Sequence, residues 1–234
     1  MGTQVIKNKP SWLGDLNIGD YAHALAMDYG ADAVDNTVLT DTTHSSAGGL
    51  LTFGFSVDAY ADFTNADSAV FADVAQAVPL TFATSSGADD EVAYLINARQ
   101  ISTTPIDGAV GEMAGMNISG GAAGGLTRGI IEFNSSATSS STTTGSQLGA
   151  VSAAQRIVAN LHVTTAVGSA LDVIVQSDDN SGFTSPTNRI TFSQATGITS
   201  QHLSLAGAVT DDYWRLSYTI AGGSFTFAVA LGIA

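Results

Sequence analysis

Gly48-Gly-Leu-Leu-Thr-Phe-Gly-Phe-Ser-Val-Asp-Ala-Tyr60 is the stretch of this 234-residue chain that most clearly indicates its fold. Apolar residues alternate with polar or small ones from Leu51 to Ala59, which is the period of a half-buried β-strand. A second strand-like stretch, residues 20–30, precedes it. The acid- and Thr-rich segment 31–44 lies between the two and is expected to be a long polar loop.

The period changes after Tyr60. Ala66, Val70, Val74 and Val78 recur at i, i+4 spacing, which predicts one apolar helical face within residues 64–78. Thr64 or Asn65 is the expected N-cap, and Pro79 is expected to end the helix. Further strands are then predicted at residues 80–83, 92–101, 108–118 and 129–133, with a glycine-rich connection at 120–125.

A Ser- and Thr-rich segment, residues 134–146, contains no large apolar residue and indicates a flexible connection between two domains. Six short strands with turn residues between them, and no helix, follow in residues 147–234. That pattern is typical of a β-sandwich of jelly-roll or immunoglobulin-like type. We therefore expect a mainly β protein, with domain 1–133, connection 134–146 and a sandwich domain at 147–234.

The charge of the chain argues against attractive binding of nucleic acid. The net charge is −14, and residues 1–133 hold 16 of the 21 acidic side chains. Seven Lys and Arg residues cannot neutralise a row of phosphates. The chain has no cysteine, which excludes disulfides and thiolate metal sites, and it has no apolar run long enough for a membrane-spanning helix.

The residues suited to catalysis or metal binding do not form a recognisable site. The four histidines have no ligand spacing. The run that starts at Asp178 lacks the glycine and glutamate of a calcium loop, since Phe183 and Arg189 stand at those positions. Trp214 alternates with Leu216 and Tyr218, which favours a core role over sugar stacking. No enzymatic activity, metal or cofactor is expected.

The order of these elements resembles the tail tube, or major tail, proteins of long-tailed bacteriophages. The resemblance lies in the strand, long loop and glycine-led strand that ends in Asp58-Ala-Tyr-Ala-Asp-Phe63, followed by a helix. The segments Gly108-Ala-Val-Gly-Glu-Met-Ala114 and Gly125-Leu-Thr-Arg-Gly129 are similar to the family's final strands. The resemblance spans residues 15–133, and residues 134–234 depart from the simplest members.

The resemblance implies a tail-tube-type β-sandwich or barrel with one flanking helix, in a subunit of the virion. Copies of the chain would close rings, expected to be hexameric, that stack into a tube beside other tail proteins. DNA would pass through an acidic channel without specific binding. The long loop would then reach a neighbouring subunit, which makes its polar residues the expected assembly residues: Asp32, Asp35, Asn36, Thr37, Asp41, Thr43 and His44.

Two alternatives stay open at this point. A capsid decoration (cement) protein is also structural and would form trimers on a shell, although the long loop and helix suit stacking better. A carbohydrate-binding module would rest on the C-terminal sandwich alone.

Overall fold

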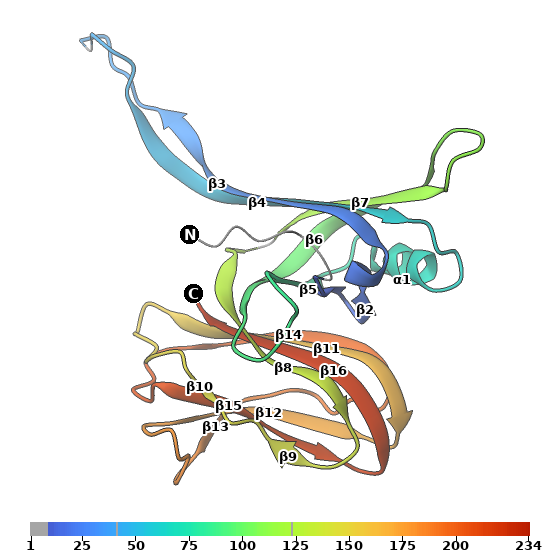
Figure 1. The fold of residues 1–234 in the computed structure, drawn as a ribbon. Helices are drawn as coiled ribbons and strands as arrows, with labels where there is room; N and C mark the ends of the chain where they lie inside the picture. The colour runs from blue at the N-terminus through green and yellow to red at the C-terminus, as the bar shows by residue number, and fades with distance from the viewer. Residues whose placement is uncertain (1–8, 41, 123) are drawn as a thin grey trace.

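The computed structural model describes residues 9–40, 42–122 and 124–234, so Asp41 lies outside the described residues. The chain is mainly β with one short α-helix, as predicted (Figure 1). The elements of the first half are β1 (Ser11–Leu13), β2 (Leu16–Asn17), the 3-10 turn η1 (Ile18–Asp20), β3 (Ala22–Asp35), β4 (Ser46–Tyr60), α1 (Ala66–Asp73), β5 (Val78–Ala83), β6 (Val92–Asp107), β7 (Gly115–Ala122) and β8 (Thr127–Ala137). Those of the second half are β9 (Ser141–Thr142), β10 (Ser146–Gln147), β11 (Arg156–Gly168), β12 (Leu171–Asp178), β13 (Thr187–Thr191), β14 (Thr199–Ala206), β15 (Tyr213–Ile220) and β16 (Gly223–Ile233).

Two antiparallel sheets build the molecule. The larger has the order β14-β11-β16-β8-β6-β5-β1-β2, and it continues from β6 through β7 and β4 to β3. The smaller has the order β10-β15-β12-β13, with β9 also paired to β15. Figure 1 shows the large sheet curling, so that β3, β4 and β7 form an upper layer over β5 and β6. Its other end lies on the small sheet as a β-sandwich.

Apolar side chains fill a core in each half. The core of the C-terminal sandwich includes Trp214, Phe225 and Phe227, which are fully buried. The core of the N-terminal half includes Phe55, Phe82 and Ile118. The predicted core role of Trp214 is confirmed, and its indole N–H donates to the carbonyl of Gly149 (2.9 Å).

A buried polar network joins the two halves between β5 and β11. The amide group of Asn160 donates to the Leu80 carbonyl and to Thr81 Oγ1, both at 3.0 Å. His162 Nδ1 lies 2.6 Å from the Gly14 carbonyl and its Nε2 lies 2.8 Å from Thr81 Oγ1. Because a carbonyl only accepts, Nδ1 carries the proton and Nε2 accepts from the Thr81 hydroxyl. The network therefore fixes one tautomer of a fully buried histidine.

The helix is shorter than predicted, and this part of the prediction is wrong. Ala66 and Val70 are buried as expected, but α1 ends at Asp73 and Val78 begins strand β5. The chain leaves the helical conformation at Val74, whose ψ is 126°, and Ala75 follows with a positive φ of 66°, so neither residue continues a right-handed helix. Val78 then pairs with Ala98 of β6, so the sheet takes the residue that the helical period would have used.

Strand β8 crosses the boundary expected at residue 133. Its residues Phe133–Ala137 pair with Phe225–Val229 of β16, and its first residues pair with β6. The Ser/Thr-rich segment 134–146 therefore contains the end of β8, all of β9 and the first residue of β10. The division into two domains stays a prediction, but one strand of the large sheet belongs to both halves.

Candidate assembly surface

A long hairpin formed by β3 and β4 projects from the body of the molecule (Figure 1). The two strands pair from Ala22 with Ala59 out to Asp35 with Ser46. On its other side, β4 pairs with β7 only from Gly54 to Tyr60. Beyond Gly54 the two strands of the hairpin therefore have only each other as described partners. Residues 31–35 and 46–47, expected to be loop or at its edge, extend the hairpin as strand, and the described residues 36–40 and 42–45 lie outside the strands.

The outer part of this hairpin exposes an unusual number of large apolar side chains. Leu39 is fully exposed and Leu50 is 81% exposed. Tyr29, Val34, Val38 and Leu51 are also exposed. Apolar side chains gathered on a projecting element mark an interaction site, because isolated soluble proteins keep such patches small. The same hairpin carries the acidic residues Asp28, Asp32 and Asp35, all exposed.

The predicted assembly residues gather at the tip of the hairpin, where Thr37 is the central hydrogen-bonding group. Its N–H and hydroxyl both donate to Asp35 Oδ1, at 2.9 and 2.5 Å, and its oxygen accepts from the Ser45 N–H (3.0 Å). These bonds hold the pKa of Asp35 below its usual value. The Asn36 side chain accepts from the Ser45 hydroxyl (2.7 Å).

The other members lie around this turn. His44 Nδ1 lies 3.5 Å from the Thr37 hydroxyl and 3.7 Å from Asp35 Oδ2, and the His44 side chain is 92% exposed. Thr43 is exposed in the turn, and Asp32 is exposed on β3. The structure thus gives the tip a defined shape, while the role of these residues in assembly stays a prediction.

A second, smaller projection was missed by the sequence analysis. Residues 108–118 were predicted as one strand, and this is wrong: Gly108–Ala114 is the turn that connects β6 to β7. Gly108 and Gly111 have φ of +140° and +95°, values that side chains rarely adopt. These two glycines were the signal for a turn. Ile106, Val110 and Met113 are exposed there, at the end of the sheet opposite the hairpin (Figure 1).

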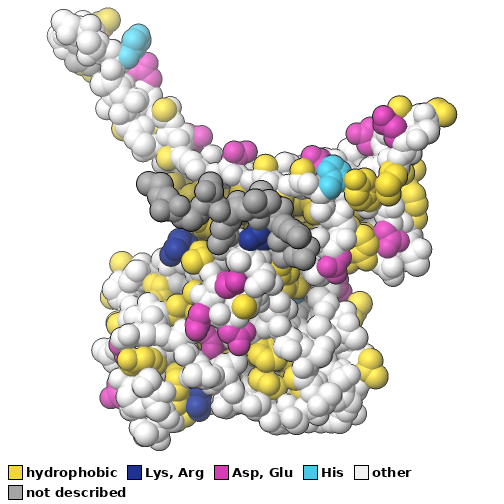
Figure 2. All heavy atoms as spheres, in the orientation of Figure 1, with side chains coloured by type: hydrophobic (Ala, Val, Ile, Leu, Met, Phe, Trp, Pro, Cys, Tyr) yellow, Lys and Arg dark blue, Asp and Glu magenta, His cyan; other side chains and the backbone are white. Residues whose placement is uncertain are grey.

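The sheet between the two projections has one polar face. Its side chains form cross-strand rows, one of which joins Ser56, Ser119 and Ser102, and another Asp58, Asn117 and Thr104. The Asn117 amide donates to Asp58 Oδ1 (2.6 Å). Asp28 stands on β3 opposite Gly54. No Lys or Arg stands in these two rows of described residues, and Figure 2 shows acidic side chains along this edge.

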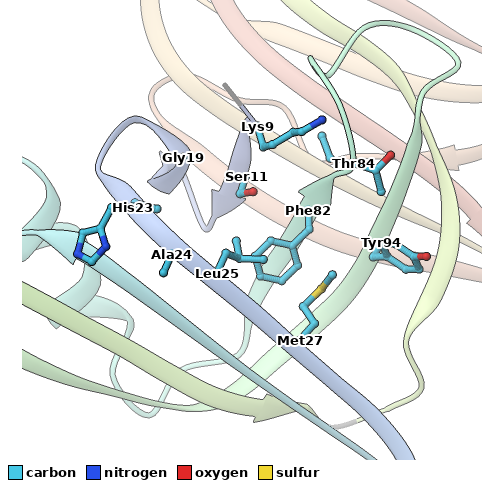
Figure 3. Close-up of a pocket in the computed structure, with 12 residues that line it drawn as sticks. Lys9, Ser11, Gly19, His23, Ala24, Leu25, Met27, Phe82, Thr84 and Tyr94 are labelled. Atoms are coloured by element: carbon cyan, nitrogen blue, oxygen red, sulfur yellow. The ribbon is translucent and has the colours of Figure 1, made fainter. Parts of the chain in front are cut away.

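A pocket of about 300 Å³ lies beneath β3 (Figure 3). Leu25, Met27 and Phe82 meet at its centre, and Thr84 and Tyr94 lie at one side with Lys9. His23 stands apart from these groups at the other side. No Asp or Glu is among the described residues that line it. Its walls suit an apolar group rather than an ion.

The ionisable groups of the described residues do not cluster into a metal site, since no three His, Cys, Asp or Glu side chains come together. Burial lowers the pKa of His162 to about 4, so this histidine is neutral near pH 7. Asp178, the buried last residue of β12, accepts hydrogen bonds from the N–H groups of Asn180 (3.2 Å) and Ser185 (2.8 Å) in the turn that follows. No described helix has the length and apolar character needed to cross a membrane.

Comparison with solved structures finds several matches, two of which are distant likenesses. No protein-family model matches the chain, and no curated protein sequence matches it. A chain from the virion of a native gene transfer agent particle is 18% identical with a TM-score of 0.40, covering 54% of this chain and 98% of that one. The SPP1 Dit protein, described as a paradigm of the hub adsorption apparatus in Gram-positive infecting phages, is 12% identical with a TM-score of 0.38, covering 97% and 100%. Neither TM-score reaches 0.5, so neither likeness assigns a function to this chain.

Proposed function

We propose that this protein is a structural subunit of a phage-type virion, and more specifically a tail tube subunit that assembles with copies of itself. The observation that carries the proposal is the β3–β4 hairpin. It projects without another described strand beside it beyond Gly54, and it exposes apolar side chains that water disfavours. A second copy that covers these side chains removes the unfavourable free energy of exposing them to water.

The free edge of the large sheet adds to the proposal. Among the described residues only β4 pairs with β3, so no described strand covers the other edge of β3 over Ala22–Asp35. Such an edge invites pairing with another chain, and closed rings use up edges of this kind. We infer that ring closure buries the β3 edge and that stacking of rings buries the hairpin tip.

The polar face of the sheet suits a channel for DNA. Asp28, Asp58 and rows of Ser, Thr and Asn present negative charge and short side chains. Such a surface repels phosphates and offers them no cation, so DNA slides past it. We therefore place this face toward the axis of the tube, and the C-terminal sandwich toward the outside.

Negative-stain electron microscopy of the purified chain tests the proposal. Stacked rings or hollow tubes with a central channel are the expected result, and class averages give the symmetry, which we propose to be hexameric. Isolated trimers that never stack would instead favour the capsid decoration protein. Monomers at all concentrations would contradict assembly altogether.

A further inference from the structure

Two of the seven Lys and Arg residues of this acidic protein line one cleft of the described structure. Arg99 of β6, Arg156 of β11 and His202 of β14 line a cleft of about 220 Å³, which we call the basic cleft. Gly124 and Gly125, between β7 and β8, form part of its wall. Two of the five arginines of the chain therefore face the same space.

Neither arginine of the basic cleft forms an ion pair with a described carboxylate. The Arg156 side chain reaches the Ser204 hydroxyl, at 3.4 Å. No Asp or Glu side chain lines the cleft, and its wall includes Ala234, whose backbone pairs with that of Arg156 (2.9 Å). By contrast, Arg189 pairs with Asp211 at 2.9 Å. In a chain with 21 acidic residues, two arginines that line one cleft with no Asp or Glu side chain beside them form a site suited to an anion.

His202 adds a third positive group that depends on pH. Its Nδ1 lies 2.7 Å from Asn160 Oδ1, an acceptor, so Nδ1 carries a proton. Its Nε2 has no described hydrogen-bond partner. Burial first, and the charge of Arg156 second, lower the pKa of His202. A carboxylate placed in the cleft would oppose the second effect and favour the protonated ring.

We propose that the basic cleft receives the acidic tip of the β3–β4 hairpin from a second copy of this chain, with the Asp32 carboxylate between Arg99 and Arg156. Asp32 is exposed, and its carboxylate has no described hydrogen-bond partner. Copies with a net charge of −14 repel one another, so their contact needs positive charge where the acidic hairpin arrives. This inference rests on the proposed self-assembly and names the surface that receives the hairpin.

The hairpin tip and the basic cleft are placed so that each copy can contact the next in the same way. The cleft lies near the middle of its own β3 strand, where a Cβ built on Gly125 would stand 3.7 Å from the hydroxyl of Tyr29. The tip, in contrast, points away from the body (Figure 1). Tip and cleft are thus different surfaces of one chain, and a head-to-tail contact between them propagates from copy to copy.

Charge reversal tests the contact. Arg99→Glu combined with Arg156→Glu should raise the concentration needed for assembly about tenfold or more, as should Asp32→Lys, because each puts like charges together. The triple variant should regain assembly. Arg128→Glu is the matched control, since Arg128 is exposed on β8 outside the cleft. Sedimentation velocity gives the assembly state, and thermal melting checks the fold of each variant. If the cleft variants assemble as Arg128→Glu does, the inference is overturned while the proposed function stands.

Cross-linking gives a readout that does not require tubes. The natural chain has no cysteine, so Ala33→Cys in one copy and Gly124→Cys in another can form a disulfide only between copies. Gly124 is suitable for this substitution because a Cβ built on it has no other atom within 4 Å. Mixed under oxidising conditions, the pair should give a dimer on a non-reducing gel. The control is Ala33→Cys mixed with Ser139→Cys, which lies in the turn after β8. A dimer without tubes would support the cleft and contradict the tail tube. Tubes without a specific dimer would support the tail tube and overturn the cleft contact. If neither tubes nor a specific dimer form, the tail tube and the cleft contact are both overturned.

Discussion

Glu132 is the most unusual carboxylate of the molecule. It is almost fully buried on β8 and accepts hydrogen bonds from Thr143 Oγ1 (2.5 Å) and Ser146 Oγ (3.1 Å). Asp90 also binds the Ser146 hydroxyl, so two carboxylates share one donor. Burial raises the pKa of Glu132 to about 7, and the charges of Asp90 and Asp89 add to this against the two hydroxyl hydrogen bonds. Below about pH 7 the folded chain therefore holds Glu132 in its protonated form.

We predict that Glu132→Gln stabilises the protein above pH 7. The folded state holds a proton on Glu132 that the unfolded state loses at its ordinary pKa of 4.5, so wild-type stability falls as the pH rises from about 4.5 to 7. The variant has no carboxyl group there to ionise, so it should not lose this stability. The rise of the Glu132 pKa from 4.5 to about 7 limits the gain in the free energy of unfolding to about 3 kcal/mol. Urea unfolding at pH 5 and pH 8 measures it. Equal differences between variant and wild type at both pH values would contradict the prediction.

His162 has the opposite pH dependence. Its pKa falls from 6.5 to about 4 on folding, so the unfolded chain binds a proton that the folded chain refuses between these values. Its contribution to stability is present above pH 6.5 and is lost as the pH falls toward 4. His162→Gln should destabilise the protein at pH 7 by about 1–3 kcal/mol, because the bonds to Thr81 and Gly14 change. It should also lose less stability than wild type between pH 6.5 and 4. Parallel pH profiles would contradict this account.

At the scale of elements, shortening the hairpin should remove assembly while leaving the fold intact. Replacing residues 36–45 by Asn-Gly keeps a tight two-residue turn between β3 and β4. The exposed tip contributes little to either core, so the free energy of unfolding should change by less than about 1 kcal/mol. Assembly should be lost. A matched control replaces Val110, in the opposite projection, by Ser. Long tubes formed by the shortened chain would contradict the assembly role of the tip.

The elements also show what the sequence can predict. Strict alternation identified β4, β15 and β16, and i, i+4 spacing located the helix at Ala66 and Val70, because these patterns follow from which side chains are buried. The end of the helix was not predictable from spacing, since Val78 fits both a helical face and strand β5. The length of the hairpin was also missed. Its strands continue through residues 31–35 and 46–47, where both faces are exposed, so no alternation of buried and exposed side chains marks them. The basic cleft joins residues from β6, β11 and β14, and no local pattern reveals such a meeting.

At the scale of the whole molecule, one sheet passes through both halves. β8 pairs with β6 on one side and β16 on the other, and Ile131 packs with Trp12, Leu95 and Ala230 between the two main cores. We predict one cooperative unfolding transition for the entire chain, because neither half can lose β8 without exposing apolar surface and strand edges. Differential scanning calorimetry should give equal calorimetric and van't Hoff enthalpies. Two resolved transitions would show that the halves unfold independently.

The proposed channel makes a prediction about charge. Asp28→Lys with Asp58→Lys places two cations on the polar face of the sheet, far from the hairpin tip. Assemblies should still form, but they should retain duplex DNA at low salt and release it as salt increases. The control is Asp172→Lys with Asp179→Lys in the C-terminal sandwich. Equal DNA retention by both double variants would place the polar face away from the channel.

Strand β8 also constrains how this protein can change in evolution. A domain joined by a loose connection can be exchanged between genes as a cassette, and the Ser/Thr-rich segment looks like such a joint. Here the junction lies inside a sheet, and Gly129 of β8 faces Gly232 of β16 so closely that a Cβ on Gly129 would stand 1.9 Å from the Leu231 carbonyl. A foreign C-terminal half would have to supply a strand that matches this register and this close approach. We expect the two halves to have been inherited together rather than shuffled.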